Sequence, residues 1–128
     1  MTLTVDLVIV GMTDAAAAAA TDAVRRGERV LVVGESKDAC YCRGLRRAVH
    51  AAGNGCRERL SILAGFEVVS VDGMGGVEVV LVRNVKTGGL IGVNAGALLA
   101  TTAYTVAIHW RQAHAYLNKA EKTLADLK

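Results

Sequence analysis

A short glycine-containing turn near the amino terminus is the part of this sequence best suited to hold an anionic ligand. Gly11, Thr13 and Ala16 stand at the three positions of a G-x-G-x-x-G/A pattern. In that pattern the small residues allow a tight turn, the close approach of a pyrophosphate, and tight packing of a helix on a strand. The first position is intact and the third is an accepted substitute, whereas the second carries a side chain. The sequence therefore indicates a dinucleotide-type turn whose phosphate contact is obstructed.

The side chains around this turn affect how well a phosphate could bind. Thr13 and Asp14 offer N-cap chemistry to the helix that follows, but the Asp14 carboxylate would repel a bound anion. The Thr13 hydroxyl could still donate to a phosphate, so nucleotide binding is expected to be weakened and not abolished. After the next strand, Glu35 stands one step beyond the usual position of a ribose-binding acid. Ser36 with Lys37 is the best candidate for a 2′-phosphate contact.

The elements that position the turn form a strand, a helix and a strand. An apolar run over residues 6–10 ends at the turn, and a helix then continues to Arg26. Gly27 supplies the left-handed residue at which a helix commonly ends. Residues 30–33 are fully apolar, as is typical of a buried parallel strand. Together they predict a right-handed βαβ unit.

The following residues predict a further helix and more strands. Residues 37–52 indicate a second helix, and residues 60–63 a third parallel strand. Three strands are then expected to form an antiparallel meander: residues 66–71, 77–85 and 90–93. Residues 97–102 are expected to form a last strand that rejoins the parallel sheet. The predicted fold class is α/β, a three-layer Rossmann-like parallel sheet with an inserted antiparallel β-meander and a long C-terminal helix.

That C-terminal helix is predicted from a stripe of apolar residues. They recur at alternating spacings of four and three, the pattern of a coiled-coil seam: Val106, Trp110, Ala113, Leu117, Ala120, Leu124 and Leu127. We expect residues 1–102 to form the Rossmann-like, dinucleotide-binding-type domain and residues 103–128 to form an oligomerisation or packing element. A homo-oligomer or a partner subunit would then be contacted through four residues: Val106, Trp110, Leu117 and Leu124. Alternatively, the stripe packs on the chain's own sheet.

Composition excludes several classes of protein. The chain has 128 residues, of which 52% are hydrophobic, enough for one domain with its own core. No apolar run reaches the ~18 residues of a membrane span, and the amino terminus lacks the features of a signal peptide. A net charge of +3 with few aromatic residues does not indicate nucleic-acid binding. Three cysteines, an odd number, favour reduced thiols and a cytoplasmic location.

The cysteines and arginines offer weaker chemistry. Cys40 and Cys42 are two residues apart on a predicted helix and would point to different faces, so they make a poor disulfide. Adding His50 and Cys56 does not produce the spacing of a zinc site, so free thiols and no metal are expected. Five arginines either bind phosphate at the carboxyl edge of the sheet or form a solvated surface, and the second interpretation is favoured: Arg43, Arg46, Arg47, Arg57 and Arg59.

The order of these parts resembles the nucleotide-binding domains of the thioredoxin reductase-like and pyridine nucleotide–disulfide oxidoreductase flavoproteins. The segment VIVGMTDAAAAAATDAVRRGERVLVV resembles their first strand, helix and second strand. The segment VEVVLVRNVKTGGLIGVNAGALLATTAYT resembles their meander and closing strand, and the hairpin at residues 83–88 is especially similar to that of thioredoxin reductase. The resemblance covers roughly residues 5–105 and includes the spacing between the parts.

The resemblance implies a site for FAD or NAD(P), and this sequence departs from it in several places. The implied cofactor-binding residues are Gly11, Met12, Thr13, Ala15, Ala16, Glu35, Ser36, Lys37, Thr101 and Thr102. The chain has no second dinucleotide domain, and Cys40-Tyr41-Cys42 stands in place of a C-x-x-C redox pair. In the A-T-G turn that follows the closing strand, Thr102 replaces the glycine that approaches the cofactor. The domain is thus a degenerate version of the pattern.

Two functions remain open from the sequence. The first is an FAD/NAD(P)-binding-type domain related to flavoprotein oxidoreductases, acting as a subunit of a redox complex. Any reaction would then be an oxidoreduction supplied by the cofactor, since no general base, nucleophile or complete catalytic site is identifiable. The second is a degenerate, non-catalytic structural or interaction module that oligomerises through its C-terminal helix and binds no dinucleotide.

Overall fold

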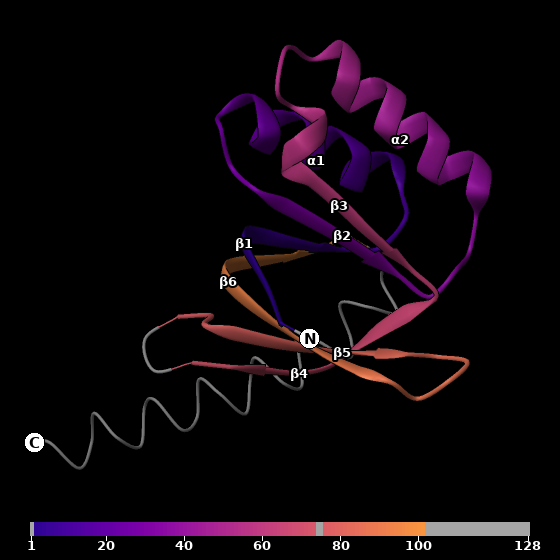
Figure 1. Ribbon diagram of the computed structural model, residues 1–128, viewed down its shortest axis with the longest axis vertical. Coiled ribbons are helices and arrows are strands. Elements are labelled where there is room, and N and C mark those ends of the chain that lie inside the picture. Colours follow the sequence, from indigo (N-terminus) through magenta and orange to yellow (C-terminus); the bar gives the residue numbers. More distant parts are fainter. Residues whose placement is uncertain (1, 74–75, 102–128) are drawn as a thin grey trace, which may run out of the picture.

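The computed structural model describes residues 2–73 and 76–101 of the chain. The predicted C-terminal helix, its apolar stripe and Thr102 therefore lie outside the described residues. The elements follow one another in this order (Figure 1): β1 (Thr2–Val10), α1 (Asp14–Arg25), β2 (Val30–Gly34), α2 (Ala39–Ala51), η1 (Arg57–Arg59), β3 (Leu60–Ala64), β4 (Phe66–Asp72), β5 (Val79–Asn84) and β6 (Leu90–Ala100).

The strands form one six-stranded mixed sheet in the order β3-β2-β1-β6-β5-β4. β1 pairs in parallel with both β2 and β6, and β2 pairs in parallel with β3. β4, β5 and β6 are joined as an antiparallel meander. The opening βαβ unit, the third parallel strand and the meander are thus confirmed, and the fold is a mixed α/β, Rossmann-like one.

The prediction of two separate strands over residues 90–93 and 97–102 is wrong. A single strand, β6, runs from Leu90 to Ala100 and pairs first with β5 and then with β1. Gly96, which lies between the two predicted strands, has a packing reason to be there. A Cβ atom on Gly96 would lie 3.3 Å from the Asp6 carbonyl oxygen, so the missing side chain lets two strands approach closely.

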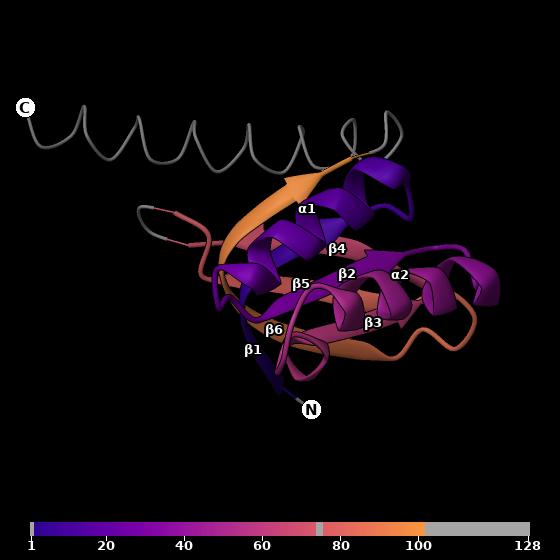
Figure 2. The same ribbon diagram turned by 90° about the horizontal axis from the view of Figure 1, so that it is seen from above.

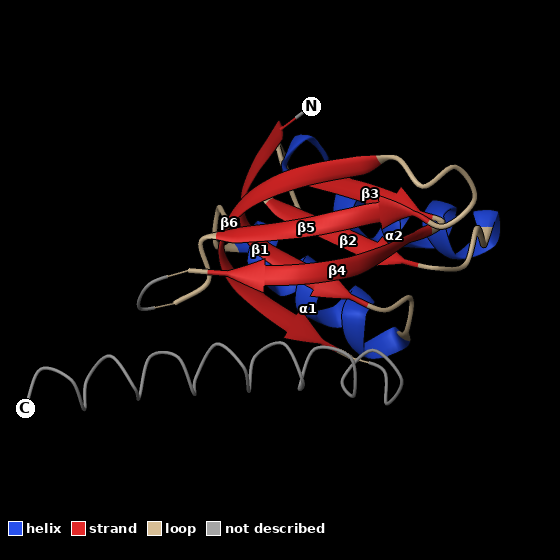
Figure 3. Cartoon of the chain, turned by 90° about the horizontal axis from the view of Figure 1, so that it is seen from below, coloured by secondary structure: helices blue, strands red, loops and turns tan. Residues whose placement is uncertain are grey.

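The central strands are covered on both faces, which produces three layers. Val8 and Val10 of β1, with Leu31 and Val33 of β2, pack against the meander. The alternate residues, including Ile9, pack under α1 and α2. Figures 2 and 3 show the two helices together on one side of the sheet and β4 and β5 on the other. Burial on both faces explains why β2 reads as an unbroken apolar run.

Strand β1 changes the direction of its side chains at Asp6. The amides of Asp6 and Leu7 both donate to the Arg29 carbonyl, at 2.8 and 3.1 Å. The register with β6 is the same before and after Asp6, but Val5 packs on the meander side, whereas Leu7 packs on the helix side. β1 also begins at Thr2, earlier than predicted, because its alternating first residues extend the pairing with β6.

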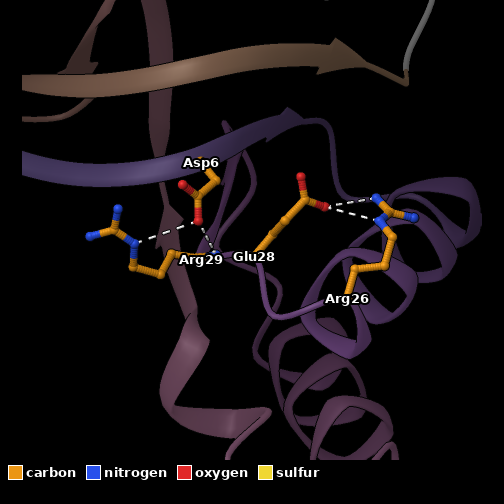
Figure 4. A network of polar contacts seen from close by, with 4 residues as sticks. All are labelled: Asp6, Arg26, Glu28 and Arg29. Atoms are coloured by element: carbon orange, nitrogen blue, oxygen red, sulfur yellow. Dashed lines mark hydrogen bonds and ion pairs between the residues drawn. The ribbon is translucent and has the colours of Figure 1, made fainter.

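The Asp6 side chain also ties β1 to the residue before β2 (Figure 4). Its carboxylate accepts a hydrogen bond of 2.7 Å from the Arg29 amide, and the Arg29 guanidinium lies 3.5 Å away. Beside it, Arg26 and Glu28 form a separate exposed ion pair. The hydrogen bond from the Arg29 amide, followed by the interactions with its side chain, lowers the pKa of Asp6 below the usual value of 3.8.

This lowered pKa predicts a loss of stability in acid. The stabilisation by Asp6 is fully present above the unfolded-state pKa of 3.8 and is lost as the pH falls through the lower folded-state pKa. We expect Asp6→Asn to reduce the change in unfolding free energy between neutral pH and about pH 3, measured by urea titration. Glu58→Gln, at an exposed position in η1, is the control. An unchanged acid dependence in Asp6→Asn would contradict this role.

Candidate functional site

The carboxyl ends of the four parallel strands lie along one edge of the sheet. In open α/β sheets, ligands bind at this edge, where the connections on the two sides of a strand diverge. Here that place is the end of β1, which lies between β2 and β6. The residues that leave the strands at this edge are the turn after β1, the connection from Gly34 to Asp38 after β2, Gly65 after β3, and Thr101 after β6.

The turn after β1 has the geometry that its glycine predicts. Gly11 has φ of 114°, a conformation that residues with a Cβ atom rarely adopt. Its amide donates to the Val33 carbonyl at 2.8 Å, which ties the turn to β2. Thr13 then caps α1, because its hydroxyl oxygen accepts a hydrogen bond of 3.1 Å from the Ala16 amide. The predicted N-cap is confirmed.

The Thr13 hydroxyl is also bonded to Thr101 across the switch between β1 and β6. It donates to the Thr101 hydroxyl oxygen at 2.9 Å, and that hydroxyl in turn donates to the Val10 carbonyl at 3.0 Å. The Thr101 amide donates to the same carbonyl at 2.9 Å. The one proton of the Thr13 hydroxyl is thereby used within the protein. A phosphate contact through this hydroxyl would have to replace the bond to Thr101, and that contact stays a prediction.

The start of α1 nevertheless keeps two amide donors. The amides of Asp14 and Ala15 have no hydrogen-bond acceptor among the described residues, as is usual for the first turn of a helix. These amides also carry the positive end of the helix dipole. The capped Ala16 amide is the donor that is lost, and the exposed Asp14 carboxylate opposes an anion. The geometry therefore allows a pyrophosphate contact that is weaker than the full pattern provides.

Tyr41, which the sequence analysis did not single out, contacts the same turn. Its hydroxyl donates to the Thr13 carbonyl at 2.6 Å, and its amide is capped by the Asp38 carboxylate at 3.0 Å. Burial of the phenol, with a smaller contribution from the Asp14 charge, raises the pKa of Tyr41 above 10.0. An Asp three residues before a Tyr is a detectable N-cap signal, but only the fold shows that Tyr41 reaches Thr13.

Removing this phenol is expected to weaken the link between α2 and the turn. Tyr41→Phe should lower the free energy of unfolding by about 1 kcal/mol, since one neutral hydrogen bond is lost. Because folding raises the phenol pKa, this stabilisation is present below pH 10.0 and is lost as the pH rises above it. Chemical denaturation at neutral pH and above pH 10 checks both statements. Equal stability of the two proteins at neutral pH would contradict the hydrogen bond.

The predicted residues after β2 do not all meet the turn. Met12 reaches β2, since a Cβ atom on Gly34 would lie 2.6 Å from its Cγ. Lys37 instead lies against the turn between β3 and β4, where a Cβ on Gly65 would be 2.6 Å from its Cε. Glu35 and Ser36 are exposed in the connection to α2. The structure thus brings together the turn residues and Thr101 at the end of β1. It places Lys37 at the end of β3, two strands away from β1.

The cysteines and arginines divide between the surface and the core. Cys42 and Cys56 are buried and Cys40 is exposed, all three as free thiols. Arg59 precedes β3 and donates to the Val24 carbonyl at 3.3 Å, so it lies at the amino edge of the sheet. A phosphate-binding role for Arg57 and Arg59 at the carboxyl edge is therefore wrong. Three arginines are exposed on α2: Arg43, Arg46 and Arg47.

Within residues 2–73 and 76–101, no group of three or more histidine, cysteine or acidic side chains is arranged to hold a metal ion. Neither described helix has the length and apolar character that crossing a membrane requires.

Together, the sheet order, the opening βαβ unit and the meander define a Rossmann-like fold of the thioredoxin reductase type. Thioredoxin reductase from Streptococcus pyogenes has this fold, with 22% identity and a TM-score of 0.60 over 79% of this chain and 32% of that one. A geranylgeranyl bacteriochlorophyll reductase-like protein from Thermoplasma acidophilum follows at 13% identity and a TM-score of 0.66, over 88% and 42% of the two chains. The myxobacterial FAD-dependent halogenase CndH shares 15% identity and a TM-score of 0.56, over 78% and 37%.

These similarities establish the fold and no more. No protein-family model and no curated protein sequence matches the chain. The chain spans less than half the length of each of the three neighbours. The resemblance stated from the sequence is confirmed as a resemblance of fold.

Proposed function

We propose that this chain is an FAD/NAD(P)-binding-type domain that holds the dinucleotide at the turn after β1. The observation that carries the proposal is the Gly11 turn, which brings the start of a 12-residue helix to the carboxyl edge of the sheet. The Asp14 and Ala15 amides would donate to the pyrophosphate, since neither has an acceptor among the described residues. Thr101, Glu35 and Ser36 lie along the same edge.

In this proposal the chain contributes binding and orientation, and not a catalytic group. A bound flavin or nicotinamide would supply hydride or electron transfer. The Thr13 and Tyr41 hydroxyls hold the turn and α2 in place, and neither is free to transfer a proton. The chain spans less than half the length of the three structural neighbours, so the remaining parts of a redox site would lie outside residues 1–128. Free thiols suit a reducing compartment such as the cytoplasm.

Thermal unfolding in the presence of FAD or NADPH tests this function. At a ligand concentration of 100 Kd, the folded state gains about 2.7 kcal/mol, which should raise the melting temperature by roughly 10 °C. Asp14→Asn should show a larger shift at the same concentration, because the charge that opposes the pyrophosphate is removed. No shift in either protein at millimolar ligand would reject the proposal.

A second function is favoured by the closed hydrogen bonds at the turn. The Thr13–Thr101 and Tyr41–Thr13 bonds satisfy the turn without a ligand, as a structural module would require. Such a module would bind no dinucleotide and would assemble as a homo-oligomer, or with a partner subunit, through Val106, Trp110, Leu117 and Leu124. A dimeric native mass that is lost in the double variant Leu117→Asp, Leu124→Asp, together with no melting shift, would favour this function.

A further inference from the structure

The helix side of β6 carries an apolar surface that neither described helix covers. Ala97 and Leu99 are the register partners of Leu7 and Ile9 in β1, so they share the face on which those residues pack under the helices. Leu99 is nevertheless 42% exposed, and Ala97 is exposed as well. The reason is that α1 and α2 cover β1, β2 and β3 and leave the end of β6 bare (Figure 2).

The neighbouring flank of α1 is also apolar and is made of small residues. Ala16 and Ala20 are fully buried against the sheet, and the Val24 carbonyl accepts from Arg59 on the side of β3. Ala15 and Ala19, one helical turn apart, therefore lie on the opposite flank, toward β6. We call Ala15, Ala19, Ala97 and Leu99 the α1–β6 strip.

We propose that the chain's own residues 103–117 cover the α1–β6 strip. The strip begins where this segment begins, because Thr101 is held to the end of β1 by two hydrogen bonds to the Val10 carbonyl. A strand followed by a helix that returns along the same face is the connection that β1 and α1 already make. The segment carries the first half of the apolar stripe: Val106, Trp110, Ala113 and Leu117.

Size and charge match this occupant. The 12 residues of α1 span ~18 Å, and a helix over residues 103–117 would span ~22 Å. The α1–β6 strip therefore has room for the first half of the apolar stripe and not for both halves. Small alanines on α1 allow a second helix to approach closely, while Trp110 supplies bulk. Asp14 and Asp22 are exposed on α1, whereas residues 103–120 contain basic residues and no acidic one.

Trp110 provides the test, because it is the single tryptophan of the chain. In the full-length protein we expect blue-shifted indole emission that acrylamide quenches weakly and that does not change with protein concentration. Leu99→Asp should shift the emission to that of a solvent-exposed indole and raise the quenching constant severalfold. Ala97→Glu should do the same, and it decides the question if circular dichroism shows that Leu99→Asp is unfolded.

Leu90→Asp and Val85→Asp are the matched controls. Both residues are exposed, at 56% and 53%, and lie at the other end of β6 and in the hairpin before it, so the emission should stay blue-shifted in both variants. A solvent-exposed indole in the unaltered protein would overturn the proposal. A buried indole whose emission depends on protein concentration and is the same in both strip variants would also overturn it, since the apolar stripe would then pair between chains. This test does not depend on nucleotide binding.

Discussion

Replacing Thr13 with glycine is expected to tighten the binding of FAD or NADPH by roughly 10- to 100-fold. The change removes the hydroxyl that occupies the Ala16 amide at 3.1 Å, so a third amide becomes available to the pyrophosphate. One hydrogen bond to a charged group contributes about 1.5–3 kcal/mol, and 1.4 kcal/mol is a factor of ten in affinity. Isothermal titration calorimetry measures the difference directly.

Thr13→Ser is the matched control for this prediction. Serine keeps the cap on Ala16 and the hydroxyl that bonds to Thr101, so its affinity should remain that of the unaltered protein. Thr13→Gly should also lose a few tenths of a kcal/mol of stability with the cap and about 1 kcal/mol with the hydrogen bond to Thr101, which is small enough to leave the domain folded. Equal affinity in Thr13→Gly and Thr13→Ser would show that the cap does not limit binding.

Truncating Leu31 to alanine is expected to lower the free energy of unfolding by about 2–5 kcal/mol. Leu31 lies in β2 and is fully buried on the side of the sheet that the meander covers. Its loss removes apolar surface from the core and leaves a cavity, since close-packed neighbours relax only in part. An effect of this size would be a large fraction of the stability of a single domain.

Ile9→Ala tests the opposite face of the sheet in the same way. Ile9 is equally buried but packs under the helices, so a similar loss is expected there. Leu90→Ala, at a position 56% exposed, should change stability by no more than about 0.5 kcal/mol. Urea denaturation of the three variants checks all the values. If Ile9→Ala were costly and Leu31→Ala nearly neutral, the meander would not cover the sheet as described.

The opening βαβ unit was predictable because its signals are local. Gly11 and Gly27 have the positive φ angles, 114° and 87°, that only glycine adopts readily, and Thr13 caps its own helix. Gly53 and Gly55 after α2 are equally clear, with φ of 147° and 78°. Such residues specify the chain direction through their own backbone preferences, so no knowledge of distant contacts is needed.

The course of β1 and β6 depends on contacts that the sequence does not show. Gly96 lies inside β6 where the Asp6 carbonyl of β1 comes close, at 3.3 Å from where a Cβ atom would be. The side chains of β1 change face at Asp6, where the Arg29 carbonyl, 23 residues away along the chain, accepts from two successive amides. Neither effect has a periodic signature, because each results from two strands meeting in the folded sheet.

The turn that forms the candidate site was predicted from the sequence, but its hydrogen bonds were not. The sequence indicates an obstructing side chain at Thr13, and the structure adds the hydrogen bonds that this residue makes. Thr13 takes one helix amide and pairs with Thr101, and Tyr41 bonds to its carbonyl. These partners are 28 and 88 residues away, so no spacing rule could have connected them. Lys37 was assigned to the site by its position after β2, but it packs on Gly65.

The most direct test is to follow the backbone amides by nuclear magnetic resonance while ADP is added to the unaltered protein. If the start of α1 keeps its two free amide donors, saturable shifts should be centred on the amides of Asp14 and Ala15. The Ala16 amide should move in Thr13→Gly and stay nearly still in Thr13→Ser. Shifts confined to the arginines of α2, or none at the turn up to millimolar ADP, would contradict this expectation.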